Sequence, residues 1–277
     1  MSLSIFLIVL FAAALHASWN AVVKISGDKT VTTLLVTTTA AVIAALILPF
    51  LDQPLPASWG FIAASAAIHI VYFLLVARTY HAGDMGQTYP LMRGIAPLIV
   101  ALAGTLLLNE PLTKGGAAGI FLISFGVLGM ALGSRREQAH GIAYAVANAL
   151  VIAAYTLVDG LGARKSGAPI AYTLWVFLLT GLPLALWLAT KGRTALAGFD
   201  RAALWRPLLG GGATLVSYAL VLWAMTQASI PVVAALRETA ILFGAAISVF
   251  ILKENSQPIR AAAACMIAAG AAVIRIR

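Results

Sequence analysis

Five residues that can carry a charge interrupt long apolar segments of this 277-residue chain: Lys24, Arg93, Asp159, Arg237 and Glu238. An ionisable side chain inside an apolar segment of membrane-spanning length is costly, and by default it marks a functional site. Three of the five are cations, and a guanidinium group makes two parallel hydrogen bonds to a carboxylate. The set therefore predicts a site for a small anionic or zwitterionic molecule, with Asp159 binding an ammonium group where there is one.

The first apolar segment carries a polar stripe at helical spacing. His16, Asn20 and Lys24 recur at every fourth position, with Trp19 beside them. Residues four apart lie on one face of an α-helix, so these side chains share a face. We expect that face to line a polar cavity. The alternative is that it forms hydrogen bonds between helices.

Aromatic residues accompany the other charges. Tyr155 precedes Asp159 by one helical turn, and Tyr72 and Tyr218 occupy corresponding positions in two halves of the chain. We expect these rings to contact the non-carboxylate part of a substrate. The predicted substrate-binding residues are His16, Trp19, Asn20, Lys24, Tyr72, Arg93, Tyr155, Asp159, Tyr218 and Arg237. The candidates for carrying a proton are His16, Asp159 and Glu238.

Arg93 also has a structural interpretation. It could be an internal cation paired with Asp159, and Arg237 could pair with a neighbour of Glu238. Arg237 and Glu238 point about 100° apart on a helix, so they cannot share one partner. Pro97 has no N–H to donate to the carbonyl of Arg93, which predicts a kink in that helix.

The elements that must position these residues are transmembrane helices. Hydrophobic residues make up 62% of the chain and charged residues 10%. Soluble domains are about half apolar and about a quarter charged, so a soluble enzyme is excluded. A single cysteine, Cys265, excludes a disulfide scaffold. The net charge of +9 does not indicate nucleic-acid binding, because the Lys and Arg residues fall in short gaps between apolar segments, beside membrane lipid head groups.

Ten apolar segments are long enough to cross a bilayer, which takes roughly 20 residues. They lie at 3–23, 31–51, 58–80, 86–108, 115–133, 141–161, 169–190, 205–227, 230–252 and 258–274. We therefore predict an all-α polytopic membrane protein. The small residues in the fifth segment include two GxxxG pairs, Gly115/Gly119 and Gly129/Gly133, which are typical of close helix packing in lipid.

The two halves of the chain resemble each other. Arg93 is followed by Glu110 seventeen residues later, and Arg237 is followed by Glu254 at the same spacing. We predict two five-helix units, 1–133 and 141–277. Because each unit has an odd number of helices, the two have opposite orientations in the membrane. Inverted repeats are frequent in secondary transporters, which bind substrate near the midplane between the halves.

The sequence resembles the EamA domains of the drug/metabolite transporter superfamily. The resemblance rests on the paired five-helix units, on the segments ARTYHAGD and AMTQAS that follow the third and eighth helices, and on the acidic caps NEPLT and KENSQ. It covers essentially the whole chain and implies a ten-helix exporter of amino acids or related metabolites that works by alternating access. It also implies a multi-pass protein of a bacterial-type inner membrane, with both termini in the cytoplasm and the fifth and tenth helices outside a central basket.

Other functions have less support. The sequence has no GxxxxGK[ST] motif for ATP, no His/Cys/Asp cluster with metal spacing and no sign of a cofactor, so transport would use an ion gradient, including protons, or the substrate gradient. An integral-membrane enzyme acting on lipid or isoprenoid substrates and a channel remain alternatives. The count of Lys and Arg in alternate gaps favours termini outside the cell, against the orientation that the resemblance implies.

Overall fold

The computed structural model describes residues 1–24, 29–133, 139–196, 205–251, 253 and 258–276. Every regular element in these ranges is a helix, which confirms the all-α prediction. The α-helices are α1 (Leu3–Lys24), α2 (Lys29–Ile47), α3 (Trp59–Ala82), α4 (Met85–Leu108), α5 (Lys114–Gly129), α6 (Ala139–Ser166), α7 (Pro169–Leu196), α8 (Trp205–Gln227), α9 (Ile230–Arg237), α10 (Ala240–Ala246) and α11 (Pro258–Ile276). Short 3-10 turns cover Leu48–Phe50, Pro56–Ser58 and Met130–Gly133, and Ile247–Ile251 is π-helical.

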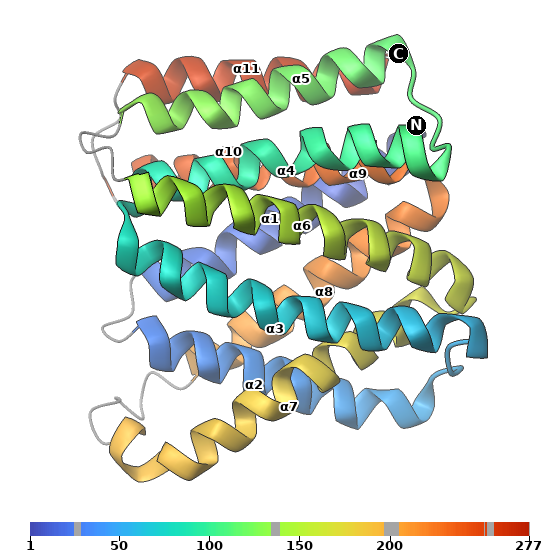
Figure 1. Ribbon diagram of the computed structural model, residues 1–277, viewed down its shortest axis with the longest axis vertical. Helices are drawn as coiled ribbons and strands as arrows, with labels where there is room; N and C mark the ends of the chain where they lie inside the picture. Colours follow the sequence, from blue (N-terminus) through green and yellow to red (C-terminus); the bar gives the residue numbers. More distant parts are fainter. Residues whose placement is uncertain (25–28, 134–138, 197–204, 252, 254–257, 277) are drawn as a thin grey trace.

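Nine helical segments in the described part of the chain are long and apolar enough to cross a membrane. One of them, Ile230–Ile251, combines α9, α10 and the π-helical turn. The tenth predicted span is α5, a shorter apolar helix of 16 residues that the turn at Met130–Gly133 extends. The helices run across the view in Figure 1, and both chain ends lie at the same end of the bundle, as an even number of crossings requires.

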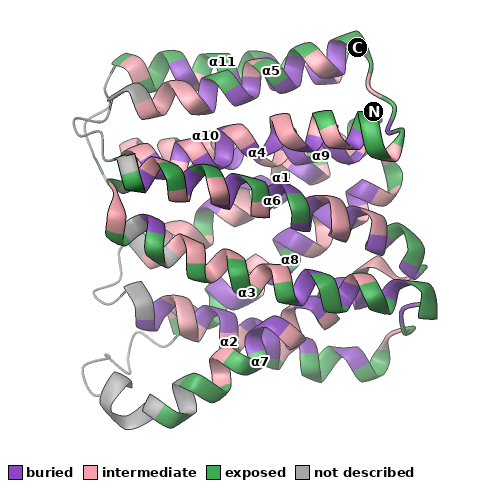
Figure 2. Cartoon of the chain, viewed as in Figure 1, coloured by how far each residue is buried: buried purple, intermediate pink, exposed green. Residues whose placement is uncertain are grey.

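The outer surface of the bundle is apolar. Large hydrophobic side chains such as Leu106, Leu107, Phe121 and Phe250 are more than half exposed. Figure 2 shows exposed residues along the outward faces of α3, α5 and α11, while buried residues gather where helices face one another. An apolar surface of this extent fits a protein surrounded by lipid.

The helices of the first and second halves pack in exchanged pairs. α3 packs against α6, and the corresponding helix of the second half, α8, packs against α1. α2 packs against α7, and α5 packs against α11 (Figure 1). Exchanging the first five spans with the last five leaves this set of contacts unchanged, which is the arrangement that an inverted repeat produces.

The contact between α5 and α11 shows the same symmetry in its individual residues. A shift of 144 positions relates Arg93 to Arg237 and also Gly126 to Gly270. A Cβ atom on Gly126 would lie 2.9 Å from the carbonyl oxygen of Ala263, and one on Gly270 would lie 2.8 Å from that of Gly119. Ala263 is Gly119 shifted by the same 144 positions, so the two close approaches are equivalent. By contrast, Gly129, from the second predicted GxxxG pair, has no atom within 4 Å of such a Cβ.

The first residues of the two acidic caps predicted from the sequence share an unusual backbone; Glu254 of the second cap lies outside the described residues. Asn109 has a φ of 52° and Lys253 a φ of 55°, both in the left-handed region. These residues are again 144 positions apart, and each follows a membrane-spanning segment. A left-handed residue is a common way to end a helix, so the two halves end their fourth spans in the same way.

The ninth span is interrupted where the sequence predicts a continuous helix. α9 ends at Arg237, and Glu238 and Thr239 form a turn whose N–H groups donate to Ala235 and Leu236, three residues back. The fourth span, for which Pro97 predicts a kink, runs as one helix through Pro90 and Pro97. The break therefore lies beside the charged residues of the second half, and discontinuous helices are a recurrent feature of transporter sites.

Candidate functional site

Arg93 and Glu238 form a buried ion pair between α4 and the break after α9. Nε of Arg93 donates to Oε2 of Glu238 at 2.8 Å, and each side chain is 5% exposed. The alternative pairing of Arg93 with Asp159 is wrong, because α9 rather than α6 presents the nearer carboxylate. Two charges removed from water are stable only when they compensate each other, so this pair fixes the broken helix against α4.

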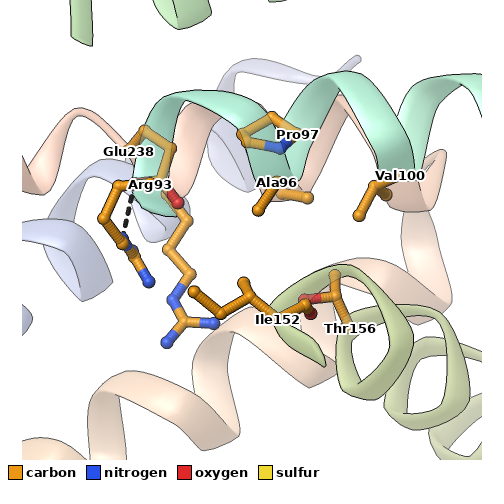
Figure 3. A pocket seen from close by; sticks show the side chains of 9 residues that line it. Arg93, Ala96, Pro97, Val100, Ile152, Thr156 and Glu238 are labelled. Atoms are coloured by element: carbon orange, nitrogen blue, oxygen red, sulfur yellow. Dashed lines mark hydrogen bonds and ion pairs between the residues drawn. The ribbon is translucent and has the colours of Figure 1, made fainter. Parts of the chain in front are cut away.

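A small cavity lies beside the ion pair, at the centre of the bundle. Arg93, Glu238 and Arg237 line it, together with Ala96, Pro97, Val100, Ile152, Thr156 and Ala234. Figure 3 shows α4 residues Ala96 and Val100 facing Ile152 and Thr156 of α6. The volume open to a water-sized sphere is about 10 Å³, enough for about one water molecule. This cavity is therefore too small for a metabolite in the conformation observed.

Arg237 and Asp159 are joined through one tyrosine. The guanidinium carbon of Arg237 lies 5.0 Å from the ring centroid of Tyr218, a cation–π contact. The hydroxyl of Tyr218 donates to Oδ2 of Asp159 at 2.5 Å. Within the described chain neither Arg237 nor Asp159 has an ion-pair partner, and Nε of Arg237 is buried without a hydrogen bond. Two opposite charges thus contact the same tyrosine, the guanidinium at the ring and the carboxylate at the hydroxyl, and neither has an ion-pair partner among the described residues.

Aromatic residues of three helices surround this arrangement. His69 of α3 stacks on Tyr155 of α6, with centroids 4.4 Å apart, and its ring meets Tyr218 of α8 edge-on at 6.1 Å. Tyr72 lies 5.7 Å from Tyr155 and 6.4 Å from His69. Three predicted tyrosines therefore gather around a histidine that the predicted site did not include.

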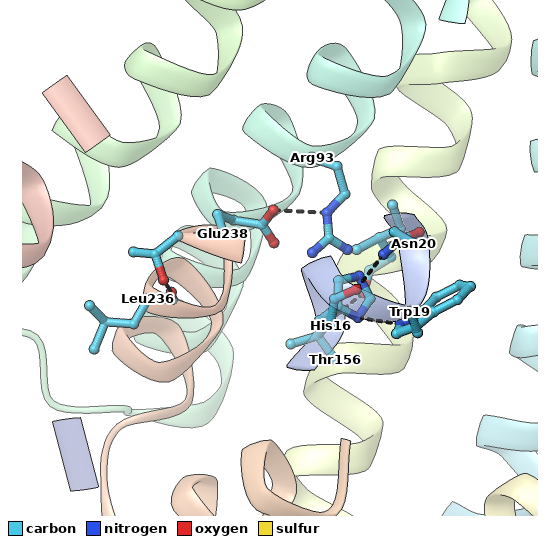
Figure 4. A network of polar contacts seen from close by, with 9 residues as sticks. His16, Trp19, Asn20, Arg93, Thr156, Leu236 and Glu238 are labelled. Atoms are coloured by element: carbon cyan, nitrogen blue, oxygen red, sulfur yellow. Dashed lines mark hydrogen bonds and ion pairs between the residues drawn. The ribbon is translucent and has the colours of Figure 1, made fainter. Parts of the chain in front are cut away.

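The stripe on α1 is largely bonded within its own helix. Nε1 of Trp19 donates to Nδ1 of His16 at 3.2 Å, and Nδ2 of Asn20 donates to the carbonyl of His16 at 2.8 Å. Figure 4 shows the guanidinium of Arg93 pointing toward this part of α1. His16 and Asn20 are partly buried. The side chain of Lys24 lies outside the described residues.

Two groups of polar residues were missing from the predicted site. Tyr172 of α7 is fully buried and donates to Oδ1 of Asp159 at 3.0 Å, so Asp159 accepts from two phenols. Arg164 of α6 forms an ion pair with Glu110. The requirement that a buried carboxylate has donors could have indicated a tyrosine near Asp159, but no spacing singled out Tyr172. Among the described residues, no three His, Cys, Asp or Glu side chains come together as metal ligands.

Comparisons with known proteins identify the family and the fold. The profile of the EamA-like transporter family matches the chain twice, over residues 3–132 and 139–276. A comparison with curated proteins gives no match. A solved structure named only "Crystal structure of protein" has a TM-score of 0.72 and 19% identity, and the match covers 99% of this chain and 97% of that one. This likeness shows a shared fold. Because the family profile covers nearly all of the chain in two copies, the protein belongs to the EamA-like transporter family, a group of multi-pass membrane transporters of the drug/metabolite superfamily.

Proposed function

We propose that the protein exports amino acids or similar small zwitterionic or anionic metabolites by alternating access between its two five-helix units, 1–133 and 141–277. The supporting observation is the pair of opposite charges, Arg237 and Asp159, that contact Tyr218 and have no ion-pair partner among the described residues. Arg237 presents a buried N–H without a partner, and Asp159 accepts only from phenols. A substrate with a carboxylate and an ammonium group would supply the missing counter-ion to each.

The two arginines have different roles in this proposal. Arg93 is already neutralised by Glu238, so a substrate carboxylate gains more from Arg237, whose charge has no partner among the described residues. Arg93 then contributes by holding Glu238 and the broken ninth span in place. Tyr72, Tyr155 and Tyr218 contact the remainder of the substrate, with Trp19, His16 and Asn20 on the α1 side and Lys24 at the end of that helix.

Binding requires a conformational change, because a space of about 10 Å³ does not hold an amino acid. In the proposed cycle, the space beside the ion pair would widen when substrate binds. The turn at Glu238 and Thr239 gives the second half a break in its ninth span at the level of the charged residues. Moving one half against the other around this break would open the centre to one side at a time.

Asp159 offers a simple route to proton coupling. A proton and the ammonium group of a substrate would compete for the same carboxylate, so binding of one releases the other. Exchange of an outgoing amino acid for an incoming proton would follow from this competition. Glu238 and His16 are the other candidate proton carriers; Glu238 is paired with the cation Arg93, and His16 accepts from Trp19. The exchange would operate in a bacterial-type inner membrane with both termini in the cytoplasm.

Counterflow in proteoliposomes tests the proposal. Vesicles loaded with one unlabelled amino acid are tested for accumulation of the same labelled amino acid, across a panel of side-chain classes. A carrier shows saturable counterflow, whereas a channel does not. We expect Arg237→Gln to abolish counterflow and Arg206→Gln to leave it intact, because Arg206 lies over the ring of the exposed Trp205. Absence of transport for every amino acid, or an Arg237→Gln variant that transports like the wild type, would refute it.

A further inference from the structure

A second, larger cleft opens at one end of the bundle. Its volume is about 440 Å³, within the range of small-molecule sites. It lies between the α6–α7 turn, the end of α8 and the segment after α2, and its polar lining consists of Asp52, Arg164, Thr226 and Gln227, with Trp223 beside them. The chain termini lie at the same end of the bundle as the α6–α7 turn (Figure 1). Unlike the central cavity, this cleft has room for a metabolite in the conformation observed.

Arg164 connects the cleft to the contact between the two halves. Nε donates to the carbonyl of Met225 at 2.7 Å, and Nη2 donates to that of Ala228 at 2.8 Å. Both terminal nitrogens also bond the carboxylate of Glu110, which follows α4 in the first half. Oε2 of Glu110 accepts in turn from the N–H of Ile230, the first residue of α9. These bonds hold the end of α4 to α6, α8 and α9, and so join one half to the other.

The two members of this ion pair differ in their access to the cleft. The Arg164 side chain is 30% exposed and lines the cleft, whereas the Glu110 side chain is 4% exposed. A carboxylate arriving in the cleft therefore meets the guanidinium and not its partner. Breaking the pair without a replacement would leave a buried charge uncompensated, which is strongly unfavourable. A carboxylate that shares the guanidinium with Glu110 avoids that cost, because the buried Glu110 side chain then keeps its counter-charge.

We infer that the cleft is a docking site for the carboxylate of the substrate, with Arg164 as its ligand, and that the docked carboxylate competes with Glu110 for this guanidinium and weakens the link between the two halves at this end. The inference rests on the proposed function, since it assigns the first contact of the same substrate. Asp52 lines the same cleft and is exposed, so it is placed to attract the ammonium group of a zwitterion.

The geometry of α6 gives a path from this cleft toward Arg237. Ala163 lines the cleft, Thr156 lines the central cavity, and Asp159 lies between them on the same helix. Positions three, four and seven apart share a helix face. Asp159, fully buried with its two tyrosine partners, therefore lies between the docking site and the central cavity along α6.

Accessibility of a single cysteine tests the docking site without relying on transport. Gln227 is exposed in the cleft, so Gln227→Cys in a Cys265→Ser background gives one reactive position there. The rate of its modification by a membrane-impermeant thiosulfonate is measured with L-alanine, sodium acetate or sodium chloride at equal ionic strength. We expect L-alanine and acetate to slow modification at least threefold and chloride to have no effect.

Variants of the ion pair identify the ligand. Arg164→Gln should abolish protection by acetate, and Lys165→Gln, which removes the adjacent cation that lies over Phe61, should retain it. Glu110→Gln removes the competing charge and should give half-maximal protection at about tenfold lower acetate. If Arg164→Gln does not yield folded protein, the acetate concentration for half-maximal protection in Glu110→Gln shows whether Arg164 is the ligand. Equal protection by chloride, or an unchanged acetate dependence in Glu110→Gln, would overturn the inference.

The two proposals fail in different ways. One outcome is counterflow that depends on Arg237, while neither L-alanine nor acetate protects the Gln227→Cys variant from the thiosulfonate. This outcome would refute the docking site and leave the proposed function standing. Protection that depends on Arg164, in a protein that shows no counterflow with any amino acid, would refute the proposed function and leave a carboxylate site in the cleft.

Discussion

Arg93 and Glu238 lie 145 positions apart in the chain, and their side chains meet inside the bundle at 2.8 Å. One belongs to the fourth span and the other to the interruption of the ninth, so the pair links the two halves. Its charges are almost completely removed from solvent. The stability of the protein should therefore depend on both charges being present or both being absent.

Glu238→Gln should destabilise the protein by about 3–5 kcal/mol, because it leaves the guanidinium of Arg93 buried without a counter-charge. The double variant Arg93→Leu/Glu238→Leu should recover most of that loss, since a buried pair replaced by apolar residues is often close to neutral. Thermal unfolding of the detergent-purified variants measures both effects. A double variant less stable than Glu238→Gln would contradict the compensation argument.

Tyr218 and Tyr172 provide a matched pair of substitutions at Asp159. Each Tyr→Phe change removes one donor and should cost about 1–3 kcal/mol of stability. Only Tyr218 also contacts Arg237, so Tyr218→Ala should reduce counterflow more than Tyr218→Phe, whereas Tyr172→Phe should reduce it about as much as Tyr218→Phe. Unfolding and counterflow are measured on the same preparations. Similar transport by Tyr218→Ala and Tyr218→Phe would show that the ring does not position Arg237.

Alanine substitutions at two glycines of α5 and α11 distinguish the effect of helix packing on stability from the effect of helix propensity. Gly270→Ala places a Cβ atom 2.8 Å from the carbonyl oxygen of Gly119 and should destabilise by about 1–3 kcal/mol, as overpacking does. Gly129→Ala meets nothing within 4 Å and should be neutral or slightly stabilising. The midpoint of thermal aggregation, followed by size-exclusion chromatography, reports the difference. Equal midpoints would show that α5 and α11 separate easily.

The orientation in the membrane is open to a direct measurement. A fluorescent protein fused to the C-terminus is fluorescent in the cytoplasm, and an alkaline phosphatase in the same position is active only outside. We expect fluorescence and no phosphatase activity. The opposite result would agree with the distribution of Lys and Arg and would place the cleft on the outer face.

The sequence allowed the helices and the repeat to be predicted because bilayer thickness sets the length of an apolar segment. The matching of Arg93 with Arg237 extends to Gly126, Gly270, Asn109 and Lys253, all related by one shift. These features depend on residue type and spacing alone. The division into the units 1–133 and 141–277 stays a prediction.

The partners of the charges could not be predicted in the same way. Whether Arg93 meets Asp159 or Glu238 depends on how α4 sits between α6 and α9, which spacing along one helix does not determine. The break at Glu238 and Thr239 contains neither glycine nor proline, so no local signal marks it. Arg164 lies in the short charged segment between two apolar segments, where the sequence indicates only a loop cation. In the structure its guanidinium group bonds Glu110 of the first half and Met225 of the second.

The contact between α5 and α11 has a consequence for the order of assembly. In the chain, α11 follows α6, α7, α8, α9 and α10, so α5 is made well before the helix that packs against it. Until α11 packs, the shallow groove at Gly119 and Gly126 of α5 is open to the surrounding lipid. Completing the second half therefore closes a surface that belongs to the first.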